Sequence, residues 1–132
     1  MKDRTFLILA VVISLAIKIP VSLFIVNGLG IDESLYLATA RDYSETGEFG
    51  IKTEFNDFKF IAPLLAFVMS GFYKIFGDMG SLLVSPIMGS LAIIPFFYLG
   101  KLALGPKAGR IAAILLLFNP AYFLLSTRPL TE

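Results

Sequence analysis

Cysteine and histidine are both absent from the 132 residues of this chain, and charged residues make up only 16% of it. Without cysteine the chain forms no disulfide and offers no thiolate to a metal. Without histidine, a general base must be a carboxylate, a lysine or a tyrosine, and a conventional zinc site has no ligand set. The formal net charge is only +1. Because no basic stripe is interleaved with aromatic residues either, we expect no nucleic-acid partner.

What the chain has in excess is apolar sequence. Hydrophobic residues account for 57% of the chain, and the mean hydropathy of +0.83 is far above that of a soluble globular domain. We therefore predict an all-α, multi-pass protein of the cell membrane. A first apolar run over residues 5–26 is long enough to cross the ~30 Å hydrocarbon core as a helix. It is longer than the apolar region of a signal peptide, so we predict a retained signal-anchor.

The charges at the two ends of this first run predict its orientation. Lys2 and Arg4 precede the run, and the acidic pair Asp32 and Glu33 follows it. The positive-inside rule then places the N-terminus in the cytoplasm and the acidic pair on the extracytoplasmic side. Within the run, we expect Lys18 to snorkel or to pair with a backbone carbonyl.

Residues 27–80 are predicted to form an extracytoplasmic loop with two juxtamembrane helices, near 32–45 and 61–76. Asp32 is well suited to cap the first of these helices. The second is apolar, but it is shorter than the ~20 residues that a membrane-crossing helix needs. No period is evident between the two helices, and we predict irregular chain there.

Two more transmembrane helices are predicted, over residues 81–104 and 110–127. Their connection carries three basic residues and no acid, namely Lys101, Lys107 and Arg110. If residues 61–76 lie along the interface, this connection is cytoplasmic, as the positive-inside rule requires, whereas a crossing there would place it outside. We therefore predict three transmembrane and two juxtamembrane helices in a single membrane portion, residues 1–132.

Several short motifs follow one another in a characteristic order. An acidic DE-x-x-Y-x-x-x-A helix precedes a proline-led apolar helix that ends in Phe-Gly, then a Gly-x-x-Ala-Gly-Arg connection and a closing S-x-R-x-x-T-acid pattern. The residues that form the first and last motifs are Asp32, Glu33, Tyr36, Ala40, Ser126, Arg128, Thr131 and Glu132. In this order and spacing the chain resembles the N-terminal part of a GT-C membrane glycosyltransferase of the protein-O-mannosyltransferase and aminoarabinose-transferase type.

The resemblance implies a polyprenyl-phosphate-linked sugar as donor, mannose-like or another hexose or pentose. It implies transfer to a hydroxyl of a protein or a glycolipid on the extracytoplasmic face of the bilayer. No cofactor is implied, and a divalent metal is not indicated. Members of the family are several times longer, so we expect the rest of the site to come from further sequence or from a partner subunit.

A lipid-phosphate sugar already carries a good leaving group, so its transfer needs a base for the acceptor hydroxyl and cations for the phosphate. With no histidine present, Asp32 is the candidate catalytic base, and Glu33 is expected to orient that base or the acceptor. Attack from the face opposite the phosphate inverts the anomeric centre. The candidate substrate-binding residues are Arg128, Lys59 and Arg41 for the phosphate, Glu132 as a second acid, and Tyr36 from the first motif.

Other interpretations of the same residues are open. Asp32 and Glu33 can simply cap a surface helix and complement its dipole, and Arg128 can anchor at lipid headgroups. The chain can then be a non-enzymatic small membrane subunit, a transporter fragment or an inactive truncation. A transporter places ionisable residues near the bilayer midplane, whereas the acids of this chain gather in the predicted loop.

Overall fold

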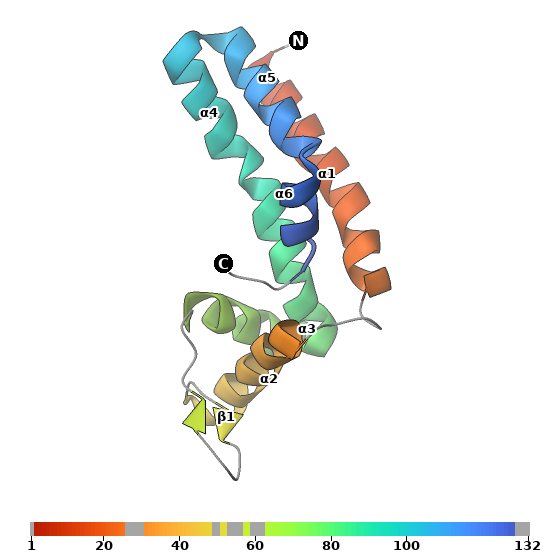
Figure 1. The fold of residues 1–132 in the computed structure, drawn as a ribbon, viewed down its shortest axis with the longest axis vertical. Coiled ribbons are helices and arrows are strands. Elements are labelled where there is room, and N and C mark those ends of the chain that lie inside the picture. Colours follow the sequence, from red (N-terminus) through yellow and green to blue (C-terminus); the bar gives the residue numbers. More distant parts are fainter. Residues whose placement is uncertain (1, 26–30, 49–50, 53–56, 59–62, 129–132) are drawn as a thin grey trace. The chain divides into compact units, whose positions relative to one another are not determined.

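The computed structural model describes residues 2–25, 31–48, 51–52, 57–58 and 63–128. In chain order the elements are α1 (Asp3–Ile25), α2 (Ile31–Thr46), β1 (Ile51–Lys52), β2 (Asp57–Phe58), α3 (Pro63–Leu91), α4 (Ile93–Leu104), α5 (Pro106–Leu117) and α6 (Pro120–Leu125) (Figure 1). The all-α prediction is confirmed. The stretch predicted to be irregular differs in one respect, because β1 and β2 form a short antiparallel ladder there.

Two compact units make up the described part of the chain. The first contains residues 2–21 and 85–127, and the second contains residues 22–84 together with Arg128.

The first unit is built on a hairpin of α4 and α5 (Figure 1). Gly105 turns the chain with φ 90°, which favours glycine, and Pro106 follows at the start of α5. The two helices approach closely at Gly109, where an added Cβ would lie 2.6 Å from the carbonyl oxygen of Phe97. The hairpin therefore depends on a residue without a side chain at this position.

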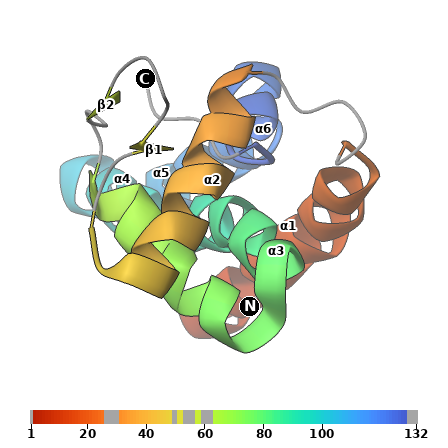
Figure 2. The same ribbon diagram turned by 90° about the horizontal axis from the view of Figure 1, so that it is seen from below.

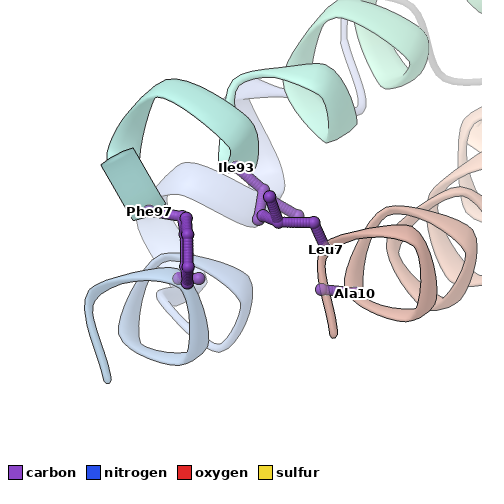
Figure 3. Close-up of a cluster of buried hydrophobic side chains, with 5 residues drawn as sticks. Leu7, Ala10, Ile93 and Phe97 are labelled. Carbon is purple, nitrogen blue, oxygen red and sulfur yellow. The ribbon is translucent and has the colours of Figure 1, made fainter. Parts of the chain in front are cut away.

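Helix α1 packs against this hairpin through a small apolar core. The buried members of the cluster are Leu7, Ala10, Ile93, Phe97 and Ala113. Figure 3 shows Leu7 of α1 directed toward Ile93 of α4. Phe97 is completely buried, and in a membrane the close packing of such a side chain, not its removal from water, holds the helices together.

A group of charges reinforces the same packing at the N-terminal end of α1. The carboxylate of Asp3 accepts hydrogen bonds from Lys101 Nζ at 2.8 Å and from Arg110 Nη2 at 3.0 Å. Two basic residues expected to set the topology therefore also bind α1 to the hairpin.

The two helices predicted over 81–104 and 110–127 each contain a break between assigned elements. At the first, between α3 and α4, the helix continues, because Ala92 keeps helical φ and ψ and its N–H donates to the Met88 carbonyl at 3.0 Å. At the second, between α5 and α6, the helix is interrupted. Asn119 caps α6, since its side chain accepts a hydrogen bond from Tyr122 N at 2.9 Å. Pro120 explains the second break, because proline donates no backbone hydrogen bond and disfavours a helical residue before it.

The second unit consists mainly of α2 and the first part of α3, which lie beside each other in Figure 2 (orange and yellow-green). Their shared core contains Tyr36 and Ala40 from α2 and Met69 and Val84 from α3. Helical geometry in α3 is broken at Gly77, where φ is 65° and ψ is −155°. The juxtamembrane helix predicted near 61–76 corresponds to the part of α3 before this break.

Within the described residues, two stretches are long and apolar enough to cross a membrane, Asp3–Phe24 and Pro63–Leu104. The 23 residues of α1 extend about 35 Å at 1.5 Å per residue, slightly more than the ~30 Å hydrocarbon core. Length and composition are thus compatible with the predicted membrane location.

Candidate functional site

The contact that brings distant parts of the sequence together in the second unit is an ion pair between Glu33 and Arg128. Arg128 Nη1 donates to Glu33 Oε1 at 3.1 Å, across 95 positions of sequence. The carboxylate side chain is only 3% exposed, whereas the guanidinium side chain is 38% exposed. A buried acid is therefore held by a cation that also faces outward.

Local structure explains the position of both partners. Glu33 lies in the first turn of α2, where the positive end of the helix dipole favours a carboxylate. Arg128 follows the last turn of α6, in which the Thr127 hydroxyl donates to the Leu124 carbonyl at 2.9 Å. The backbone N–H of Thr127 donates to the same carbonyl at 3.3 Å, so Thr127 is held to the C-terminal end of α6 by two hydrogen bonds.

The other residue of the acidic pair, Asp32, belongs to the same first turn. Helix α2 begins at Ile31, so Asp32 is a helical residue and not the cap that the sequence predicted. Its side chain lies outside the described residues, as do the whole of Lys59 and Glu132. The predictions for these three residues remain predictions.

Arg41, a candidate phosphate ligand, is engaged elsewhere. Its Nη2 donates to both carboxylate oxygens of Asp78, at 2.8 and 3.0 Å, and its guanidinium lies 5.7 Å from the Tyr73 ring centroid. The adjacent carboxylate raises the pKa of Arg41 above its ordinary value. Sequence reasoning did not identify Asp78, because no motif or period connects it to α2.

Tyr36 is 7% exposed and belongs to the apolar core shared by α2 and α3. The side chain therefore contributes to the packing of these two helices. Its predicted contact with substrate stays a prediction.

Lys18 also departs from expectation. Its side chain is 1% exposed, and Nζ has no hydrogen-bond partner among the described residues. Nζ lies 4.4 Å from the centroid of the Tyr122 ring. No sequence pattern indicates this contact, because the two residues come from opposite ends of the chain.

The Glu33–Arg128 pair has a definite chemical capacity. A guanidinium has five N–H donors, and the contact with Glu33 uses one of them. The partly exposed Arg128 can therefore bind a phosphate while Glu33 fixes its orientation. No group of three or more potential metal ligands occurs among the described residues.

The fold places the chain in the class of all-α proteins, and two of its described stretches are long and apolar enough to cross a membrane. Comparison with known proteins finds no matching family model, no similar curated protein and no similar solved structure.

Proposed function

We propose that this chain is the N-terminal part of a GT-C-type glycosyltransferase that uses a polyprenyl-phosphate sugar. In this proposal three helices cross the membrane, and α2 and the first part of α3 lie along its extracytoplasmic surface. Asp32 is the catalytic base, and Arg128 binds the donor phosphate. The acceptor is a hydroxyl of a protein or a glycolipid.

The observation that carries the proposal is the Glu33–Arg128 ion pair. A carboxylate that is 3% exposed holds a guanidinium that is 38% exposed, and the residue before that carboxylate in the sequence is Asp32. Pairing to Glu33 limits the orientations of the Arg128 side chain before substrate arrives. A positioned cation stabilises charge that develops on a leaving phosphate more effectively than a mobile one does.

Contacts inside the second unit support the surface position of α2 and the first part of α3. Tyr43 of α2 stacks edge-on against Phe67 at 5.8 Å between ring centroids, and Arg41 reaches Asp78 just beyond Gly77. Residues 63–78 thus contact α2 near both of their ends. If they crossed the bilayer, the charged α2 would have to cross beside them, at a high cost.

The proposed reaction needs only a carboxylate that acts as a base and a cation that binds phosphate. The Asp32 carboxylate takes the proton of the acceptor hydroxyl, whose oxygen attacks the anomeric carbon. The bond from that carbon to the phosphate oxygen breaks on the opposite face, and the lipid phosphate leaves with the electron pair. The configuration at the anomeric carbon inverts, and Arg128 binds the departing phosphate.

The test is sugar transfer in membranes that contain the complete enzyme, this chain together with the further sequence or partner subunit that completes the site, supplied with a radiolabelled polyprenyl-phosphate hexose. Asp32→Asn is the decisive variant, because asparagine has nearly the size and shape of aspartate but cannot accept the proton of the acceptor hydroxyl. We expect transfer to fall about 10²- to 10⁴-fold, the usual contribution of a general base. Glu45→Gln, an exposed acid on the same helix, is the control.

Transfer by Asp32→Asn at the wild-type rate would refute the catalytic role. If neither the wild-type protein nor any variant released lipid phosphate from the tested donors, the interpretation as a non-enzymatic membrane subunit would replace the proposal.

A further inference from the structure

An elongated apolar groove runs along α1 in the first unit. A cavity of about 470 Å³ is lined by Ile13, Ser14, Ile17 and Lys18 of α1 and by residues of α5, α6 and the turn between them. A second hollow of about 190 Å³ continues it toward the N-terminal end of α1, as far as Phe6. The larger cavity alone is of a size that holds small ligands.

The two hollows adjoin each other, because both are lined by Ile13, Leu117 and Phe118. From Phe6 to Lys18 the groove follows twelve residues of helix, which is about 18 Å. One leaflet of a ~30 Å hydrocarbon core is about 15 Å thick, so the groove has roughly the length of one lipid chain in a leaflet.

Polar groups are concentrated at the Lys18 end of the groove. The Lys18 side chain lines the larger cavity, and its Nζ is buried against the Tyr122 ring without a hydrogen-bond acceptor among the described residues. Ser14 lies one helical turn earlier and lines the same cavity, with its hydroxyl 2.9 Å from that of Ser90. A buried ammonium that has an aromatic face beside it but no hydrogen-bond acceptor in the described part of the chain is incompletely compensated, and an anion is its natural partner.

We propose that this groove binds a single-chain amphiphile with an oxyanion head, a carboxylate or a phosphate. The head pairs with the Lys18 ammonium, which leaves the Tyr122 ring by rotation of its flexible stem, and the Ser14 hydroxyl is a second donor. The apolar chain lies along α1 toward Phe6. This inference goes beyond the proposed glycosyl transfer and does not depend on it.

Saturation binding of radiolabelled dodecanoate to the full chain in lipid nanodiscs tests the proposal, with empty nanodiscs subtracted. We expect one site per chain, displaced by dodecyl phosphate and not by dodecanol or by inorganic phosphate at the same concentration. Lys18→Met should weaken binding about ten- to a hundredfold, the usual effect of losing a hydrogen bond to a charged group. Lys107→Met, which removes an exposed lysine of the same unit, should bind as the wild type does.

A second pair of variants keeps Lys18 and tests the volume of the larger cavity. Ile17→Trp fills the cavity and should also weaken dodecanoate binding at least about tenfold. Ile8→Trp places the same side chain at an exposed position of α1 that lines neither hollow, and should leave binding unchanged. If Lys18→Met fails to fold, the comparison of Ile17→Trp with Ile8→Trp tests the proposal.

Dodecanoate binding that survives both Lys18→Met and Ile17→Trp would overturn the proposal. So would equal displacement by dodecanol, which would show that the charge is not recognised. Equal displacement by inorganic phosphate would show an anion site without a chain-binding groove. Cross-linking of Lys18 to a protein in place of a lipid would identify a protein carboxylate as its partner and would likewise overturn it.

Discussion

The unequal burial of Glu33 and Arg128 predicts unequal costs for removing either partner. Arg128→Gln removes a cation from beside a carboxylate that is only 3% exposed. The Arg128 side chain is 38% exposed, so water also reaches the pair. We therefore expect Arg128→Gln to lower the free energy of unfolding by about 1–3 kcal/mol, which is less than the loss expected for a fully buried pair. Glu33→Gln leaves a partly exposed guanidinium, and the glutamine oxygen still accepts its hydrogen bond. Its cost should be about 0.5–1 kcal/mol.

The measurement is a double-mutant cycle on the two single variants and their combination, with denaturant unfolding in micelles followed by circular dichroism. We expect a coupling energy of at least about 1 kcal/mol. The Arg41–Asp78 pair is the matched control, because its side chains are 52% and 53% exposed, and its coupling should stay within about 0.2–1 kcal/mol. The reasoning is refuted if the two coupling energies are equal, or if Glu33→Gln destabilises more than Arg128→Gln.

Two further predictions concern the first unit and use the same unfolding measurement. Gly109→Ala should lower the free energy of unfolding by about 1–3 kcal/mol, because its Cβ would lie 2.6 Å from the Phe97 carbonyl oxygen. The control is Gly71→Ala, whose Cβ would have no neighbouring atom within 4 Å, and it should be neutral or slightly stabilising. Equal losses would contradict the close approach of α4 and α5. Asn119→Ala should lower the free energy of unfolding by about 1 kcal/mol, because α6 loses its cap, and Asn119→Asp should keep the wild-type stability. An Asn119→Ala variant as stable as the wild type would argue against the cap.

Helix content could be predicted from the sequence because apolar runs and their breaks are local signals. The run over 5–26 corresponds to α1, and the helix near 32–45 corresponds to α2. The interruption at Asn119 and Pro120 was also visible in the sequence, but the long apolar composition around it favoured one continuous helix. Apolar composition alone does not distinguish one helix from two that are joined at a proline.

The contacts of the charged residues could not be predicted in the same way. Charge patterning placed Arg128 near the acidic pair but could not choose Glu33 as its partner or indicate how deeply Glu33 is buried. The contacts between Arg41 and Asp78 and between Lys18 and Tyr122 depend on packing across 37 and more than one hundred positions of sequence. Local periodicity carries no information at such separations.

The central claim is that the acidic pair is presented on the extracytoplasmic side of a membrane, and single-cysteine labelling tests it most directly. The chain has no cysteine of its own, so Glu45→Cys on α2 and Lys107→Cys on α5 each carry one exposed thiol. With a membrane-impermeant maleimide, we predict that Glu45→Cys is labelled on intact cells and that Lys107→Cys is labelled only after permeabilisation. Labelling of both thiols on intact cells, or of Lys107→Cys alone, would contradict the account.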